Sequence, residues 1–170
     1  NLSLRDIIKD RMKELGVSCQ CIRCREYGHR VRDGWTIGPP QMVRRSYEAL
    51  GSTEVMLSYE DERSTLYGLL RLSLAWRNGG EAGVKPDAAT VRELHVFGPE
   101  VSLGERDNSA AQHRGLGAAL LGEAERICSD EYGAGELRVL SGVGVRQYYR
   151  NLGYRLEEPY MVKRLSAPDR

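Results

Sequence analysis

The stretch Gln112-His113-Arg114-Gly115-Leu116-Gly117-Ala118 decides how the rest of the chain is interpreted. It contains two glycines separated by a single residue, and apolar residues follow at helical spacing from Gly115 to about Tyr132. The N–H groups at the start of a helix bind anions, and a chain approaches a ligand closely only where side chains are absent. We therefore predict a helix-opening turn that holds a pyrophosphate group, with Arg114 as a nearby cation. A plain helix-opening loop is the alternative.

The segments around this turn predict an α+β fold. Apolar, aromatic and β-branched runs divided by turn residues are typical of strands, whereas helical spacing marks a second, shorter helix. The predicted strands are Met42–Tyr47, Glu54–Tyr59, Thr65–Ala75, Thr90–Phe97, Glu136–Leu140 and a final extended segment, Tyr154–Leu165, that Pro159 interrupts; the short helix is Arg146–Leu152. A meander followed by helix, strand, helix and strand predicts an α+β sandwich.

The first forty residues differ in character from the rest. Residues 2–16 have the spacing of an amphipathic helix, in which Ser3 and Asp6 resemble a capping pair. Residues 17–40 have too little periodicity for a regular element, so that something other than an apolar core must order them. We therefore divide the chain into an N-terminal helix with a cysteine-rich segment, residues 1–40, and a main domain, residues 41–170.

Three of the four cysteines, Cys19, Cys21 and Cys24, lie within six residues. This spacing is poor for disulfides and suits a metal bound by thiolates, so we predict a structural zinc site. Zinc would order a segment that has few apolar residues. His29 is the nearest candidate for the fourth ligand, whereas Cys128 lies on an apolar helix face and is expected to be a buried thiol. Free thiols are the alternative.

Charge is distributed unevenly along the chain. Residues 1–45 carry ten Lys and Arg against five Asp and Glu, although the whole chain has a net charge of +1. Such a cationic segment favours an anionic partner, and an ordinary solvated face is the alternative. Six arginines surround the cysteines and are candidate contacts for a phosphate backbone: Arg23, Arg25, Arg30, Arg32, Arg44 and Arg45.

Composition places the chain among ordinary globular proteins. It is 41% hydrophobic and 29% charged, and no apolar run approaches the roughly 20 residues that a membrane span needs. We expect a soluble, cytoplasmic protein without a membrane partner.

Several short segments of the sequence resemble those of known protein families. The pattern Gln-x-x-Gly-x-Gly at Gln112–Gly117, after a strand and before a helix, is the signature of the GNAT acetyltransferases. More specific phrases resemble the acetyltransferase domain of the Elongator catalytic subunit family: Leu57-Ser58-Tyr59-Glu60-Asp61, Gly68-Leu69-Leu70-Arg71-Leu72, Val91-Arg92-Glu93-Leu94-His95-Val96, the run from Ser141 to Arg150, and Pro159-Tyr160-Met161-Val162-Lys163. The resemblance runs from the first helix almost to the end of the chain. It implies a mixed, mostly antiparallel GNAT sheet flanked by helices.

The resemblance also implies a function. Members join a radical S-adenosylmethionine domain, which holds a 4Fe–4S cluster, to an acetyltransferase domain, and add a carboxymethyl group to carbon 5 of the wobble uridine of transfer RNA. Acetyl-coenzyme A supplies the two-carbon unit. The chain lacks the cysteine spacing of the radical domain, so only the C-terminal, acetyltransferase half is expected here, able to bind and slowly hydrolyse acetyl-coenzyme A. Implied partners are transfer RNA, through the basic N-terminal segment, and the radical domain; a homodimer or an Elongator-type assembly is left open.

The resemblance further implies the site residues. Glu93 takes the place of a general base and His95 could assist it, whereas Tyr148 or Tyr149, with Tyr149 preferred, protonates the departing thiolate. The cofactor would contact Leu94, His95 and Val96 on the strand, the turn residues Gln112, His113, Arg114, Gly115, Leu116, Gly117 and Ala118, and Tyr148 and Tyr149. A salt bridge from Glu93 to Arg71 or Arg92, a structural His95, and two tyrosines that only pack are the alternatives.

Two other functions stay open at this point. A protein-lysine acetyltransferase, an activity also associated with the family, would need a peptide groove beside the thioester. A pure transfer-RNA-binding module would keep the cofactor turn only as a relic, although the intact glycines and the tyrosine pair argue against this.

Overall fold

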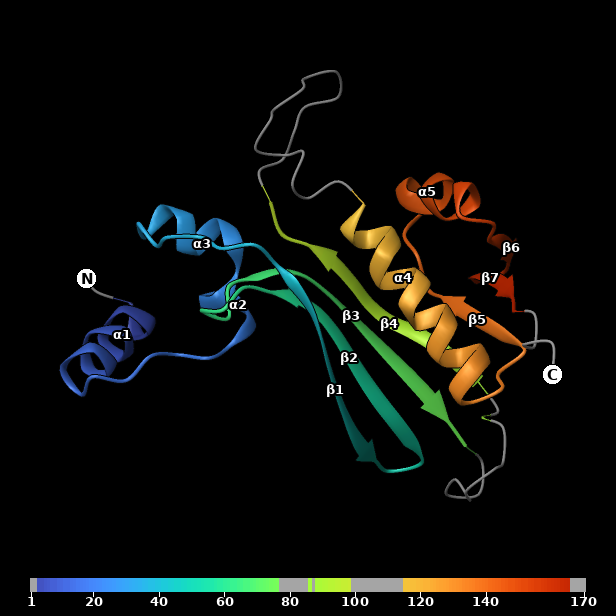
Figure 1. Cartoon of the computed structure of the whole chain (residues 1–170), viewed down its shortest axis with the longest axis horizontal. Coiled ribbons are helices and arrows are strands. Elements are labelled where there is room, and N and C mark those ends of the chain that lie inside the picture. Colours follow the sequence, from blue (N-terminus) through green and yellow to red (C-terminus); the bar gives the residue numbers. More distant parts are fainter. Residues whose placement is uncertain (1–2, 77–85, 87, 99–114, 166–170) are drawn as a thin grey trace.

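A seven-stranded mixed sheet forms the centre of the protein (Figure 1). The computed structural model describes residues 3–76, 86, 88–98 and 115–165. The strand order is β1-β2-β3-β4-β5-β7-β6, in which only the β4–β5 pair is parallel. The strands are β1 (Gln41–Ala49), β2 (Ser52–Glu60), β3 (Leu66–Ala75), β4 (Ala88–Val96), β5 (Glu136–Val139), β6 (Arg155–Glu157) and β7 (Tyr160–Arg164). The predicted α+β fold with a mostly antiparallel sheet is confirmed.

The parallel pair is short and lies next to a bulge. Two residue pairs, Thr90 with Arg138 and Val91 with Val139, join β4 to β5. On its other side β4 pairs with β3, where Glu93 faces Arg71 and Val91 faces Leu72, so Arg92 is the extra residue of a β-bulge. β4 continues five residues beyond Val91, whereas β5 ends at Val139. This leaves the end of β4 without a β5 partner in the described part of the chain.

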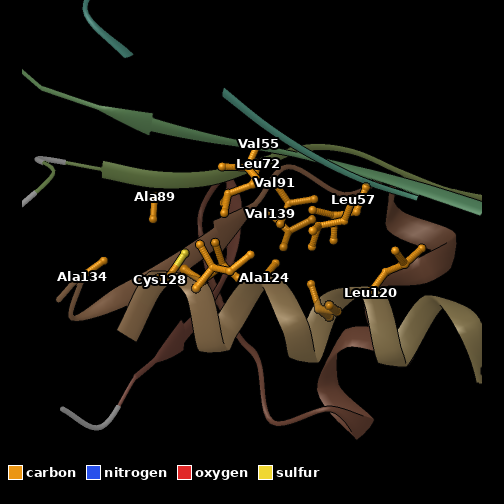
Figure 2. Packing of buried hydrophobic residues seen from close by; sticks show 14 of the residues in the cluster. Val55, Leu57, Leu72, Ala89, Val91, Leu120, Ala124, Cys128, Ala134 and Val139 are labelled. Carbon is orange, nitrogen blue, oxygen red and sulfur yellow. The ribbon is translucent and has the colours of Figure 1, made fainter. Parts of the chain in front are cut away.

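Helix α4 (Leu116–Arg126) covers one face of the sheet (Figure 2). Its apolar stripe, with Leu120 and Ala124 fully buried, packs against Leu57 of β2, Leu72 of β3 and other strand residues in a single cluster. Burying each large side chain is worth about 1.5–3 kcal/mol. The 3.6-residue spacing therefore predicted the correct face of this helix.

The end of α4 and the C-terminal segment differ in detail from the sequence predictions. The predicted helix to about Tyr132 changes after Arg126 into a π-helical turn, Ile127–Glu131. A 3₁₀ turn, Val143–Val145, leads into the predicted short helix, α5 (Arg146–Asn151). The extended segment that Pro159 interrupts is a hairpin of β6 and β7.

The N-terminal segment contains more regular structure than predicted. The amphipathic helix is confirmed as α1 (Leu4–Glu14), capped by Ser3 and Asp6. The apolar side chains of α1 are exposed, however, by 73% for Leu4 and 53% for Ile7. The expectation of an irregular stretch from 17 to 40 is wrong, because two short helices form there, α2 (Ile22–Arg25) and α3 (Tyr27–Arg32).

Polar contacts with the sheet explain why α2 and α3 form without an apolar pattern. Arg25 forms an ion pair with the buried Glu60 at 2.8 Å, and the Arg30 guanidinium donates hydrogen bonds to the Arg63 carbonyl and the Thr65 hydroxyl. These partners lie at the turn between β2 and β3, more than thirty residues away in the sequence. The spacing of apolar residues within these helices therefore could not predict the contacts.

No helix in the described part of the chain is both long and apolar enough to cross a membrane.

Candidate functional site

A pocket of about 380 Å³ lies where the end of β4, the start of α4 and the start of α5 meet. Its lining comes from three segments that are far apart in the sequence: Leu94 and Val96; Gly115, Gly117 and Ala118; and Val145, Tyr148 and Tyr149. Apolar side chains, two phenols and the opening turn of a helix form its walls. The first N–H groups of α4 have no carbonyl partner within the helix, so they are available to an acceptor.

The two glycines of the turn act in different ways. Gly115 has φ +90°, a left-handed conformation that residues with a β-carbon rarely adopt, and, chain neighbours aside, no atom of the described residues lies within 4 Å of the place of a β-carbon there. A β-carbon on Gly117 would lie 2.9 Å from the hydroxyl oxygen of Tyr148 and 3.5 Å from Val96 Cγ2. Gly115 therefore permits the turn, whereas Gly117 permits the close approach of α4 to Tyr148.

Strand alternation places the four candidate residues at the end of β4, Glu93 to Val96, on two opposite faces of the strand. Leu94 and Val96 line the pocket. Glu93 and His95 are exposed, are absent from the lining, and point to the other face of the strand. Neither Arg71 nor Arg92 forms an ion pair with Glu93 within the described ranges, and the His95 ring packs at 4.7 Å from the Phe97 ring.

The two tyrosines on α5 occupy different environments. Tyr148 is 39% exposed, whereas Tyr149 is only 6% exposed. Their rings meet edge to face with centroids 5.3 Å apart, and Tyr149 makes a similar contact with Tyr154 at 5.8 Å. Burial raises the pKa of both hydroxyls, so both stay protonated at neutral pH. Either could therefore give a proton to a strongly basic leaving group.

The remaining predicted cofactor residues are only partly placed. Gln112, His113 and Arg114 lie outside the described residues. Leu116 is half-buried and does not line the pocket. Sequence reasoning missed Val145, which lines the pocket directly before α5. Its position inside the family-like phrase Ser141–Arg150, next to the tyrosines, was the available signal.

The three clustered cysteines come together as the spacing predicts. The sulfur atoms of Cys19, Cys21 and Cys24 all lie within 4.8 Å of one another. Hydrogen bonds, first from the Cys24 backbone and then from the Cys19 side chain, lower the pKa of Cys21 to about 7, while burial and the neighbouring thiols raise that of Cys24 to about 11. Three clustered sulfur atoms, one of them on a cysteine with a lowered pKa, fit a thiophilic metal such as zinc.

His29 is not brought into that group of three sulfurs. Its Nδ1 contacts the Arg32 guanidinium, and its Nε2 lies 3.9 Å from a Glu26 carboxylate oxygen. It does line the same hollow as Cys19 and Cys24, about 540 Å³ in volume.

Four of the six arginines predicted to face a phosphate backbone have partners or are buried within the protein. Arg25 and Arg45 both pair with Glu60, Arg44 pairs with Glu131, and Arg30 is 5% exposed, although Arg44 and Arg45 stay exposed on β1. Arg23, Arg30 and Arg32 line the 540 Å³ hollow together with basic residues of α1, namely Arg5, Lys9 and Lys13.

Several known proteins resemble this chain in sequence and in structure. No family model matches the chain. Over 96% of its length the chain is 52% identical to a tRNA uridine(34) acetyltransferase of Dehalococcoides mccartyi and 46% identical to Elongator complex protein 3 of Danio rerio. It covers 36% and 30% of these proteins, so it spans about a third of their length. An archaeal Elp3 structure from Methanocaldococcus infernus, with an N-terminal deletion, superimposes on 94% of the chain with a TM-score of 0.79 and 41% identity, and the chain covers 38% of it.

Proposed function

We propose that this chain, which is similar over almost its whole length to about a third of a tRNA uridine(34) acetyltransferase and of Elongator complex protein 3, is the acetyl-transferring part of an enzyme that modifies uridine 34 of transfer RNA. The observation that carries the proposal is the pocket itself. It forms where β4 runs past the end of β5, and the opening turn of α4 forms one of its walls.

The pocket residues fit acetyl-coenzyme A. The free N–H groups at the start of α4 suit the pyrophosphate, and the small residues Gly115, Gly117 and Ala118 leave room for it. Leu94 and Val96 offer an apolar wall beside the unpaired edge of β4 to the thiol-bearing arm. When bound, acetyl-coenzyme A supplies a thioester whose carbonyl carbon accepts a nucleophile.

Tyr148 is the better candidate for the acid that protonates the departing sulfur. Its hydroxyl lies beside Gly117 at the cofactor turn, and its side chain is partly exposed at the pocket. The Tyr149 ring is buried between two other rings, which suits a supporting role. Exposure and position thus reverse the preference for Tyr149 that the sequence suggested.

Glu93 and His95 are proposed to act on the acceptor and not on the cofactor. Both project from β4 on the face opposite to Leu94 and Val96. A carboxylate there would take a proton from an attacking water or amine. His95 is held against Phe97 and would assist in orienting the acceptor.

Within the larger enzyme we propose the chemistry that the family resemblance implies. The acetyl group would become the carboxymethyl group on carbon 5 of uridine 34, with the radical S-adenosylmethionine chemistry provided by a separate domain. Zinc held by Cys19, Cys21 and Cys24 would be structural, because the Arg25 that follows them anchors this segment to the sheet.

Transfer RNA is proposed to contact the basic hollow between α1 and α3. Six cationic side chains line it, against two acidic ones, Asp6 and Asp33; the cationic residues are Arg5, Lys9, Lys13, Arg23, Arg30 and Arg32. Each phosphate contact releases counterions, so affinity should fall steeply with salt. Replacing Lys9 and Lys13 with Gln should weaken binding and reduce that salt dependence, whereas replacing the internally paired Arg44 with Gln should have little effect.

The experiment that tests the proposal measures acetyl-coenzyme A hydrolysis by the chain, with and without transfer RNA. We expect slow release of coenzyme A that responds to transfer RNA. A parallel sample contains labelled acetyl-coenzyme A and a lysine peptide. Stoichiometric acetylation of the peptide with no response to transfer RNA would replace the proposal with a protein acetyltransferase, and the absence of both coenzyme A binding and hydrolysis would exclude an acetyl-transferring role.

A further inference from the structure

A partly buried hydrogen-bond cluster of Tyr154, Glu125 and Lys163 lies outside the lining of the pocket. Tyr154 is 2% exposed, and its hydroxyl donates a hydrogen bond to Glu125 Oε1 at 2.9 Å. The other oxygen of this carboxylate accepts a hydrogen bond from Lys163 Nζ at 2.6 Å, and the ammonium lies 5.6 Å from the centre of the Tyr154 ring. The cluster joins α4, the residue directly before β6, and β7.

The cluster contacts both helical walls of the pocket. Glu125 belongs to α4, whose first turn lines the pocket more than two helical turns earlier. The Tyr154 ring packs edge-on against Tyr149 of α5, and its backbone N–H donates a hydrogen bond to the Tyr149 carbonyl at 3.0 Å. Figure 1 shows α5 beside the N-terminal half of α4. Tyr154 therefore contacts a residue of each of the two helices.

From this contact a chain of three rings leads to the pocket. The Tyr149 ring, held by Tyr154, packs edge-on against Tyr148 with centroids 5.3 Å apart. The Tyr148 hydroxyl in turn lies against Gly117, where a β-carbon would come within 2.9 Å of it. Because close-packed interiors transmit strain, a shift of Tyr154 would be expected to reach Tyr148 through the ring of Tyr149.

We propose that Tyr154 and Glu125 are positioning residues that hold Tyr148 at the cofactor turn through the ring of Tyr149. This inference rests on the proposed function, in which Tyr148 serves as the acid. Neither Tyr154 nor Glu125 touches the pocket. They act by keeping α4 and α5 at one separation, with Lys163 balancing the carboxylate charge.

Two conservative variants test the proposal. Tyr154→Phe keeps the ring and removes the hydrogen bond, and Glu125→Gln keeps the side-chain shape and removes the charge that binds Lys163. The matched control is Glu123→Gln on the same helix, whose carboxylate binds the exposed Arg126 instead. Fluorotyrosine placed at position 148 reports the environment of that ring by fluorine NMR, independently of turnover.

We expect both variants to lower the maximal rate of acetyl-coenzyme A hydrolysis roughly tenfold, because small misplacements of a reacting group are costly, while coenzyme A affinity changes less than threefold. The fluorine resonance should shift or broaden in both variants and stay unchanged in Glu123→Gln. Variants that melt at a lower temperature but keep the wild-type rate and fluorine spectrum would show a purely structural cluster and overturn the proposal. If the wild-type chain neither binds nor hydrolyses acetyl-coenzyme A, the proposed function fails. In that case a fluorine spectrum that is unchanged in both variants would still reject the coupling of Tyr154 and Glu125 to Tyr148.

Discussion

The hydroxyl oxygen of Tyr148 lies 2.9 Å from the point at which a side chain on Gly117 would begin. This contact joins the turn that opens α4 to the helix that carries both candidate acids. Tyr148 can thus lie at the cofactor turn only because residue 117 has no side chain. The same glycine that the sequence assigns to ligand binding is therefore also a packing requirement.

If Tyr148 is the acid, Tyr148→Phe should lower the maximal rate of thioester hydrolysis roughly a hundredfold, the lower end of what a general acid contributes. Coenzyme A affinity should be nearly unchanged, since the ring remains. Steady-state release of the thiol measures both quantities. Tyr149→Phe is the comparison, and we expect it to lose less than tenfold in rate. A larger loss of rate in Tyr149→Phe than in Tyr148→Phe would assign the role of the acid to Tyr149 and the supporting role to Tyr148.

The left-handed backbone at Gly115 gives a second prediction. Gly115→Ala should destabilise the protein by about 1 kcal/mol, because a β-carbon is strained at φ +90° even though no atom of the described residues blocks it. Gly115→Asn should lose less, since asparagine tolerates this conformation better. Urea unfolding measures both variants. Equal stability of all three proteins would mean that the turn relaxes to another conformation.

Glu60 links the N-terminal segment to the sheet, and it is 4% exposed. Burial alone would raise the pKa of Glu60, but hydrogen bonds from Arg45 and Ser58 and the charges of Arg25 and Arg45 outweigh burial and lower it. Because the folded pKa lies below the ordinary value of 4.5, the resulting stability is present above that pH and is lost as the pH falls below it.

Glu60→Gln should therefore destabilise the protein by about 3–5 kcal/mol at neutral pH, since it leaves two guanidinium groups without their shared carboxylate. Its stability should also depend less on pH below 4.5 than that of the wild type. Glu54→Gln, whose carboxylate accepts hydrogen bonds from Ser52 and Ser73, is the control with an expected cost of about 1 kcal/mol. Similar costs for the two variants would contradict the anchoring role of Glu60.

If the three cysteines hold zinc, the purified chain should contain one equivalent, and a chelator should remove it. A free zinc concentration one hundred times the dissociation constant would stabilise the fold by about 2.7 kcal/mol. Removal should lower the melting temperature without changing coenzyme A affinity, because the cysteines do not line the cofactor pocket. Cys21→Ser should lose the metal and Cys128→Ala should keep it. A metal-free chain that melts at the wild-type temperature would contradict a structural site.

The sequence predicted those parts of the fold that depend on local patterns. The spacing of Leu120 and Ala124 identified the buried face of α4, and the β-branched and apolar runs identified the strands. Each of these features follows from the pattern of residues within one element. The turn at the two glycines and the cluster of three cysteines also follow from residues that are close in the sequence, and the sequence indicated both.

Features that depend on contacts between distant residues were missed. Helices α2 and α3 form because Arg25 and Arg30 reach groups at the β2–β3 turn, and no periodicity records such contacts. The packing of Gly117 against Tyr148 and the place of Val145 in the pocket arise in the same way. Whether the chain divides functionally at residue 40 stays a prediction, although Glu26 pairs with Leu66 across that boundary.

The central claim is tested most directly by calorimetric titration of coenzyme A into three proteins: the wild type, Gly117→Ala and Gly122→Ala. The two variants add the same methyl group to the same helix, but outside the helix's own backbone a β-carbon at Gly122 meets no atom of the described residues within 4 Å, so Gly122→Ala should bind like the wild type and gain up to about 1 kcal/mol of stability. Gly117→Ala should bind at least tenfold more weakly, because its methyl group displaces Tyr148 and fills the turn. Equal affinity of Gly117→Ala and the wild type would contradict a cofactor site at the opening of α4.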